Sequence, residues 1–412
     1  MRVVVIGSGI VGASAAYYLS LRGAAVTVVD GGYPGEATHA GAGIVCPWVD
    51  HPEDDDWYRL TREGARHYPG LVEALGEDIG YATVGALLVA EDPVDLEPVR
   101  ALLRRRYPDA PEMGEVTDVP TPSELFPPLS DTLSALLVPG AARVDGCSVR
   151  DALLRAAVAH GAEVRTGAAT LGPDGGVFLH ALAREAFVEG ETVPPPSTLP
   201  EGAPGESAGQ AGSWRQGAPL APAAPQGPTS TRPPRFADEG VRLEADSVIV
   251  AAGAWTGQVC RPLGVKLPIF PRRGQILHVT MEGVDTAWWP MVLPRVGPYL
   301  LGFPDSRVVI GATVEDVGFA PRVTLGGLDE VIRAGLRVAP GLFAATVTEA
   351  RVGLRPVYAP GRALIGRVTG RVVVATGLSA YGLTAGPFTG EIAAALALGE
   401  EPPIDITPYA PA

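Results

Sequence analysis

Long apolar runs alternate with glycine-rich turns along much of this chain. Residues 3–6 form a β-branched run that is typical of a strand buried on both faces. An alanine-rich helical stretch follows over residues 11–22, and a second apolar strand covers residues 25–29. Strand, turn, helix and strand in this order predict the first β-α-β unit of a doubly wound parallel sheet.

The same patterns continue downstream and predict further helices and strands. One helix begins in the acidic stretch at residues 51–68 and places Trp57, Leu60, Tyr68 and Leu71 on one face. Other helices are predicted at 95–106, 144–158 and 328–338, and in the second half of 377–399. Strands are predicted within 79–90 and at 135–139, 162–167, 248–253, 274–281, 298–303, 307–314 and 371–376. We expect the three arginines at 104–106 to form a solvated helix end.

This order of elements predicts an α/β protein with two discontinuous domains. A Rossmann-type domain would comprise residues 1–50, 141–184, 241–265 and 350–412. A second, α+β domain built on a mainly antiparallel sheet would comprise residues 51–140 and 266–349. Residues 185–240 are rich in Pro, Gly, Ala and Ser, with few aliphatic side chains to bury, so we expect a disordered insertion there.

The turn after the first strand has the spacing of a dinucleotide-binding motif. Gly7 permits a sharp turn, Gly9 lets a pyrophosphate approach bare backbone, and Gly12 brings helix and strand close together. The helix N-terminus offers unpaired N–H groups to the phosphates. Asp30, at the end of the second strand, can accept hydrogen bonds from the ribose hydroxyls. These features together predict a bound dinucleotide.

The nearly uncharged stretch from Val3 to Leu21 could also be a membrane span or a signal segment. Its β-branched start, its glycines at motif spacing and its single basic flank, Arg2, favour the dinucleotide interpretation. No other stretch approaches a spanning helix, so we expect no transmembrane segment.

Charge and cysteine content restrict the partners and the compartment. The chain of 412 residues has a formal net charge of −14 at pH 7, which disfavours nucleic acid and anionic membrane surfaces as partners. Cys46, Cys147 and Cys260 are widely spaced and have no histidine cluster nearby. We therefore predict neither a metal site nor a disulfide framework, and we expect a cytoplasmic protein.

Several segments together resemble the D-amino-acid oxidase superfamily, and they are most similar to the branch of glycine oxidase and bacterial D-amino-acid oxidases or dehydrogenases. These segments are the opening motif, ATHAGAGIVCP (37–47), AAGAW (251–255), PRRGQ (271–275), RVVIGATVEDVGF (307–319), GLRP (353–356) and GLSAYGLTAGPFTGEI (377–392). They follow the order of that superfamily and leave only about residues 185–240 unmatched.

The resemblance implies an FAD that lies extended across the first domain, with its flavin between the two domains. Relatives with covalent flavin carry a cysteine in the C-terminal part, and none follows Cys260 here, so we expect noncovalent FAD. Asp30 stands where a glutamate is usual, which leaves an NAD-linked dehydrogenase as an alternative. The predicted cofactor contacts are Gly7, Gly9, Ile10, Val11, Gly12, Asp30, Thr38, Ala40, Gly41, Gly43, Ala252, Gly253, Trp255, Gly377, Gly382, Leu383 and Thr384.

The resemblance also implies a substrate site. Arg355 matches the arginine that binds the substrate carboxylate, and a guanidinium suits that task because it forms two parallel hydrogen bonds and stays charged. Tyr299 matches a substrate-facing tyrosine, and Tyr381 would cap the pocket beside the flavin. Many glycine oxidases carry a second arginine in the loop matched by residues 379–382. None is present here, which disfavours glycine as the substrate.

We therefore expect an FAD-dependent oxidoreductase that oxidises the C–N bond of an amino acid, expected to be a D-amino acid. Hydride transfer to the flavin would give an imine that hydrolyses to a keto acid and ammonia, and oxygen or a quinone would accept the electrons. One alternative is a sarcosine- or proline-type secondary-amine oxidoreductase. Another is a non-catalytic flavoprotein subunit whose 185–240 tract recruits a partner.

Overall fold

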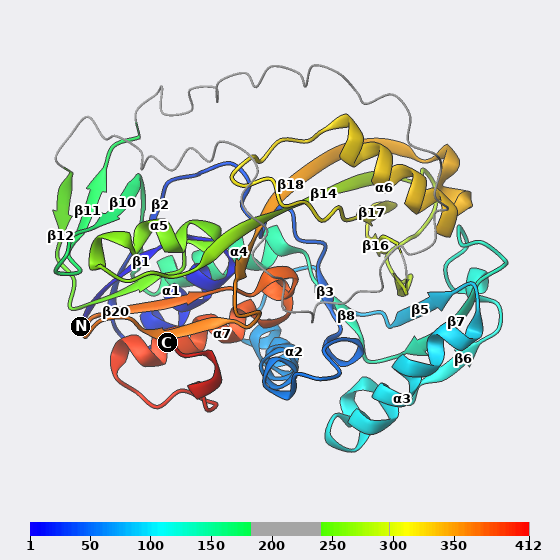
Figure 1. The fold of residues 1–412 in the computed structure, drawn as a ribbon, viewed down its shortest axis with the longest axis horizontal. Helices are drawn as coiled ribbons and strands as arrows, with labels where there is room; N and C mark the ends of the chain where they lie inside the picture. The colour runs from blue at the N-terminus through cyan, green and yellow to red at the C-terminus, as the bar shows by residue number, and fades with distance from the viewer. Residues whose placement is uncertain (183–239, 296, 412) are drawn as a thin grey trace, which may run out of the picture.

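The computed structural model describes residues 1–182, 240–295 and 297–411 (Figure 1). All but the last residue of the predicted insertion at 185–240 therefore lies outside the described residues. No helix among the described residues combines the length and the apolar composition needed to cross a membrane.

A six-stranded sheet lies on the side of the molecule where both termini are found (Figure 1). All neighbouring strands run parallel except β19 and β20, at one edge, which are antiparallel. The strand order is β19 (Leu364–Arg367), β20 (Val372–Thr376), β13 (Ser247–Val250), β1 (Arg2–Ile6), β2 (Ala25–Asp30) and β9 (Glu163–Thr166).

Two helices pack against α1 (Ile10–Leu21) beside this sheet, namely α4 (Gly146–Ala159) and α7 (Gly382–Leu398). The valines at positions 3–5 are almost fully buried, as their continuous apolar run predicts for a central strand. Helix α2 (Asp55–Leu75) packs on α7 and buries Trp57, Leu60, Tyr68 and Leu71, the face that its spacing predicts.

A second, eight-stranded sheet extends away from the first (Figure 1). It is antiparallel except where β15 pairs with β5. The order is β18 (Thr346–Tyr358), β14 (Ile269–Thr280), β17 (Arg307–Gly311), β16 (Tyr299–Phe303), β15 (Met291–Pro294), β5 (Ala86–Ala90), β7 (Ser134–Val138) and β6 (Thr117–Val119). Together the two sheets confirm the predicted fold class.

Smaller elements pack around these two sheets. Helix α6 (Leu325–Val338) packs on β14 and β17, whereas α3 (Glu97–Arg106) lies at the far end beside β5 and β7 (Figure 1). Helix α5 (Thr256–Val259) follows β13. Two three-stranded sheets complete the described part, and they consist of β3 (Ile44–Val45), β8 (Ala142–Arg143) and β4 (Ala82–Thr83), and of β10 (Ala168–Leu171), β11 (Val177–His180) and β12 (Val241–Leu243).

The structure differs from the sequence prediction at two points. The predicted domain boundary at residue 350 falls inside β18, because this strand pairs with β14 from Thr346 to Tyr358. The prediction that residues 104–106 form a solvated helix end is wrong for Arg106, which is only 5% exposed. Its guanidinium is buried because it bonds to backbone carbonyl groups and lies 3.7 Å from the ring centroid of Tyr58.

Candidate functional site

The turn between β1 and α1 is tightly constrained. Gly7 has a φ of +100°, which favours glycine, and its N–H donates to Val29 O at 2.8 Å. A Cβ at Gly12 would overlap the carbonyl oxygen of Gly7, so the close approach of helix and turn requires glycine there. The Asp30 carboxylate accepts hydrogen bonds from Ser8 N at 2.6 Å and Gly32 N at 2.6 Å, which fixes it at the end of β2.

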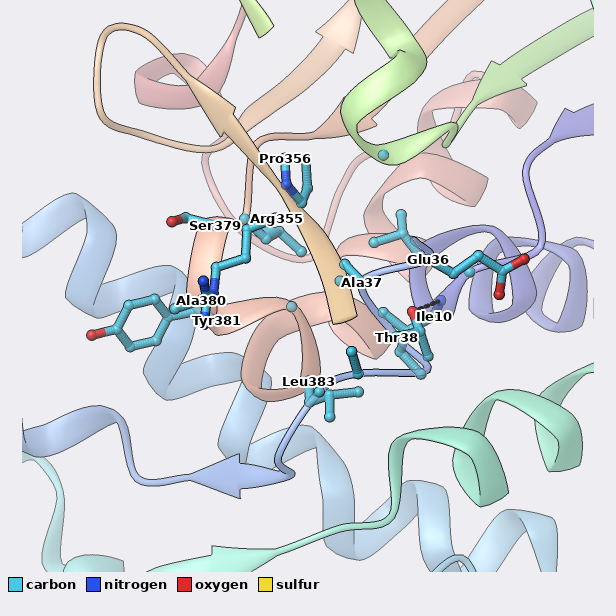
Figure 2. Close-up of a pocket in the computed structure, with 18 of the residues that line it drawn as sticks. Ile10, Glu36, Ala37, Thr38, Arg355, Pro356, Ser379, Ala380, Tyr381 and Leu383 are labelled. Atoms are coloured by element: carbon cyan, nitrogen blue, oxygen red, sulfur yellow. Dashed lines mark hydrogen bonds between the residues drawn. The ribbon is translucent and has the colours of Figure 1, made fainter. Parts of the chain in front are cut away.

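A cavity of about 280 Å³ connects this turn to the eight-stranded sheet. The nucleotide end is lined by Gly7, Gly9 and Asp30, which belong to the first β-α-β unit. The opposite end is lined by Tyr299 of β16 and Arg355 of β18. In Figure 2, Arg355 extends from its strand towards Ser379, Ala380 and Tyr381, whereas Glu36, Ala37 and Thr38 lie on the other side of the view.

Most of the predicted site residues line this cavity. The predicted cofactor contacts that line it are Gly7, Gly9, Ile10, Val11, Asp30, Thr38, Ala40, Gly41, Gly43, Ala252, Gly253, Trp255, Gly382, Leu383 and Thr384. Gly12 and Gly377 do not. Gly12 packs against the turn, and Gly377, with a φ of +80°, lies beside the backbone of Leu364 and Arg362.

The cavity fits an extended dinucleotide. Gly9 is the N-cap of α1, and a Cβ placed on it would meet only Thr38 Oγ1, at 3.4 Å, so the space beside the helix end is open. The loop from Ala37 to Gly43 supplies mainly small side chains, which leave room for a flat ring system. Thr384 Oγ1 donates to Ile44 O at 2.9 Å and thereby joins the start of α7 to this loop.

Arg355 provides a positive charge that forms no ion pair with a carboxylate in the described part of the chain. Its Nη1 donates to Thr313 O at 3.1 Å and to Arg273 O at 3.3 Å. No carboxylate among the described residues lies within 4.0 Å of it. Burial lowers the pKa of Arg355, but a guanidinium titrates so far above neutrality that it remains charged. The group is therefore available to an anion in the cavity.

The neighbouring arginines differ from Arg355 because carboxylates pair with them. Arg273 forms an ion pair with Glu315, and Arg272 donates to Asp316 at 2.8 Å. Burial alone would raise the pKa of Glu315, but hydrogen bonds from Arg273, Thr313 and Gln275 hold it at about 2. This network fixes the segments around Arg273 and Thr313, whose carbonyl groups orient Arg355.

Two further residues, Tyr299 and Gly274, lie next to the Arg355 side chain. Tyr299 interacts electrostatically with it, and burial raises the pKa of Tyr299 so that its phenol stays protonated. Gly274 lies against the guanidinium, and a Cβ there would overlap its nitrogen atoms. The glycine of the local sequence RRGQ is therefore needed for this close approach.

Tyr381 lines the cavity, and its phenol donates to Asp50 Oδ2 at 2.7 Å. Burial and the Asp50 charge raise the pKa of Tyr381 well above its usual value, so the phenol remains a hydrogen-bond donor. His51 packs edge-on against Tyr381, with ring centroids 5.0 Å apart. Burial lowers the pKa of His51 to about 4, so this ring is neutral at pH 7.

Arg106 holds the loop that carries Asp50. Its Nη1 donates to Trp48 O at 2.8 Å and to Asp50 O at 2.6 Å, and its Nη2 donates to His51 O at 2.8 Å. One buried side chain thus fixes three carbonyl groups within residues 48–51, although it lies more than fifty residues away in sequence.

Sequence reasoning missed three charged residues of the cavity wall, Glu36, Asp50 and Arg295. Asp50 lies three residues after the segment ATHAGAGIVCP (37–47), which was assigned to the cofactor. This position could have marked Asp50 as a residue of the cavity. Arg295 follows β15 and lines the cavity, and its side chain has no hydrogen-bond or ion-pair partner among the described residues. Only the parallel pairing of β15 with β5 brings Arg295 there, and that pairing has no sequence signal. Cys46 is only 3% exposed and also lines the cavity.

Comparisons of this chain with known protein families, sequences and structures agree with a dinucleotide-binding oxidoreductase site. Residues 2–188 and 229–396 match the DAO family, described as FAD dependent oxidoreductase. The crystal structure of iminodiacetate oxidase (IdaA) from Chelativorans sp. BNC1 is similar, with a TM-score of 0.83 and 40% identity, over 100% of this chain and 99% of that one. YurR of Bacillus subtilis (strain 168), an uncharacterized oxidoreductase, is 38% identical over 99% of this chain and 98% of its own length. A glycine oxidase of Pseudomonas aeruginosa (strain PAO1) is 27% identical over 100% of this chain and 98% of its own.

Proposed function

This chain belongs to the DAO family of FAD-dependent oxidoreductases, and on that premise we propose that it oxidises the C–N bond of an amine that carries a carboxylate. Membership confirms the predicted superfamily and the predicted FAD cofactor, and it removes the NAD-linked alternative. The primary candidate substrate is an α-amino acid, as its D-isomer, whose imine product would hydrolyse to a keto acid and ammonia.

Bound FAD supplies the hydride acceptor for such a reaction. The residues that would hold it are the Gly7–Gly9 turn, Asp30, the loop from Ala37 to Gly43 and the start of α7. Arg355 would bind the substrate carboxylate through two N–H groups and so orient the α-carbon in the cavity. Tyr299 and Gly274 keep this guanidinium in place.

The observation that carries the proposal is the uncompensated charge of Arg355. A positive group without an anionic partner, in a partly buried cavity wall, is costly unless a ligand neutralises it. An amine without a carboxylate would leave that charge unpaired. The site therefore favours substrates that carry an anion next to the amine.

A second candidate is a secondary amine with two carboxylates. Arg295 lines the same cavity as Arg355, has no side-chain partner among the described residues, and could bind a second carboxylate. The 40% identity with an iminodiacetate oxidase over the whole chain supports this candidate. Hydrolysis of the resulting imine would release a smaller primary amine instead of ammonia.

Anaerobic reduction of the purified holoenzyme tests both candidates. D-amino acids, L-amino acids, N-methyl amino acids and iminodiacetate are each added while the flavin absorbance is followed. Bleaching identifies the substrate class, and assays for ammonia and for primary amine distinguish the two candidates. Recovery of the colour in air shows that oxygen accepts the electrons, whereas recovery only with a quinone indicates a dehydrogenase. No bleaching with any of these compounds would refute the proposal.

A further inference from the structure

We propose that Asp50 binds the substrate ammonium group, so that the site selects zwitterions held between Asp50 and Arg355. This inference rests on the proposed function, because it names the second charge that the same cavity recognises. It also assigns a role to a carboxylate that the dinucleotide interpretation does not use.

The first argument is the position of the Asp50 carboxylate. Asp50 lines the cavity together with Arg355, Tyr299 and Tyr381. Its Oδ2 atom accepts the hydrogen bond from the Tyr381 phenol, which fixes the carboxylate. Its Oδ1 atom accepts no hydrogen bond from any described residue, so one oxygen remains available to a donor in the cavity.

The second argument is that this carboxylate forms no ion pair with a cation of the described residues. No Arg, Lys or His nitrogen of the described chain lies within 4.0 Å of it. Arg106, on α3, contacts the Asp50 backbone and not its side chain. His51, the adjacent ring, is neutral at pH 7. A half-buried carboxylate with one free oxygen therefore lacks a cationic partner, and the substrate can supply one.

The two charges are complementary to an amino acid. The guanidinium of Arg355 and the carboxylate of Asp50 do not pair with each other, so each can meet the opposite charge of one zwitterion. Both primary and secondary ammonium groups have N–H bonds to donate to Asp50 Oδ1. A carboxylic acid that lacks the amine would meet Asp50 as a like charge and bind weakly.

Binding to the oxidised holoenzyme provides a test that needs no turnover. The probes are α-aminoisobutyrate, which has no α-hydrogen and cannot be oxidised there, and pivalate, in which a methyl group replaces the ammonium. Each is titrated against the flavin absorbance of the wild type and of Asp50→Asn. The wild type should prefer α-aminoisobutyrate by about tenfold or more, and Asp50→Asn should lose about tenfold of that preference. Pivalate should bind Asp50→Asn as tightly as it binds the wild type, or more tightly.

Control variants separate recognition from structure. Glu53→Gln removes an equal charge from the exposed surface three residues away and should retain the wild-type preference. Asp50→Glu should restore part of the preference. If Asp50→Asn weakens both probes equally, or leaves their ratio unchanged, the inference is overturned. It would then fail alone, provided that amino carboxylates still reduce the wild-type flavin. If none of them does, the proposed function fails instead.

Discussion

Replacement of Arg355 by leucine is the perturbation that bears most directly on the substrate site. The change removes a guanidinium whose Nη1 is held by Thr313 O and Arg273 O, at 3.1 and 3.3 Å, and whose charge has no carboxylate partner among the described residues. It leaves the cofactor-binding residues of the first β-α-β unit intact. We therefore expect a selective loss of carboxylate binding.

The size of the loss follows from the contacts. Truncating one partner of a buried, hydrogen-bonded charge pair costs about 2–5 kcal/mol, which corresponds to roughly 30-fold to 4,000-fold weaker binding. Arg355→Lys keeps a point charge but loses the planar fork, so it should fall between the wild type and Arg355→Leu. The two backbone carbonyls lose a donor in both variants, and this should destabilise the fold by only about 1–3 kcal/mol.

The assay combines KM for the substrate, the dissociation constant of an unreactive carboxylate and the ratio of flavin to protein. KM and the dissociation constant should rise together, while flavin content and the melting temperature change little. Unchanged carboxylate affinity in Arg355→Leu would refute the assignment. Loss of FAD with unchanged affinity in the remaining holoenzyme would show that Arg355 serves the cofactor.

Three other predictions concern groups around the cavity. Gly274→Ala should raise KM about tenfold or more without loss of FAD, because the new Cβ would displace the Arg355 guanidinium; normal KM would contradict this. Arg106→Met should lower the free energy of unfolding by about 3 kcal/mol and raise KM, since three carbonyl groups of residues 48–51 lose their donor. Denaturant unfolding measures the change in stability, and an unchanged midpoint would contradict this prediction. Burial, with Arg351 and Arg307 nearby, lowers the pKa of His278 from 6.5 to about 4. Between these two values the unfolded chain binds a proton that the folded protein does not. The free energy of unfolding is therefore highest above pH 6.5 and falls by roughly 3 kcal/mol as the pH decreases towards 4. His278→Gln should therefore show a smaller decrease in melting temperature over that range, and an equal decrease would exclude this histidine.

Local sequence patterns predicted the parts of the fold that depend on neighbouring residues. The Gly7–Gly9–Gly12 spacing, the buried run at residues 3–6 and the acid at Asp30 specify a β-α-β unit within thirty residues, and the structure has it. Arg355 was predicted from the resemblance of the GLRP segment to a known family, and in the structure it lines the same cavity as the glycine turn.

The remainder depends on contacts between distant segments. Arg106 looked like one of three exposed arginines, and only the approach of α3 to the loop at residues 48–51 buries it. Arg295 reaches the cavity because β15 joins β5 in parallel, which no local signal indicates. Asp50 lies near a loop that the sequence assigned to the cofactor. No sequence pattern indicates that its carboxylate has no Arg, Lys or His nitrogen within 4.0 Å among the described residues, and this is the feature that suggests a ligand.

The central claim is that the cavity binds a carboxylate-bearing amine beside FAD and oxidises its C–N bond. The most direct measurement is the anaerobic rate of flavin reduction by an amino acid and by the amine that its decarboxylation would give. Our account predicts fast, saturable reduction by the amino acid and reduction slower by a factor of about 30 or more with the amine, because only the former engages Arg355. Equal rates for the two compounds would contradict it.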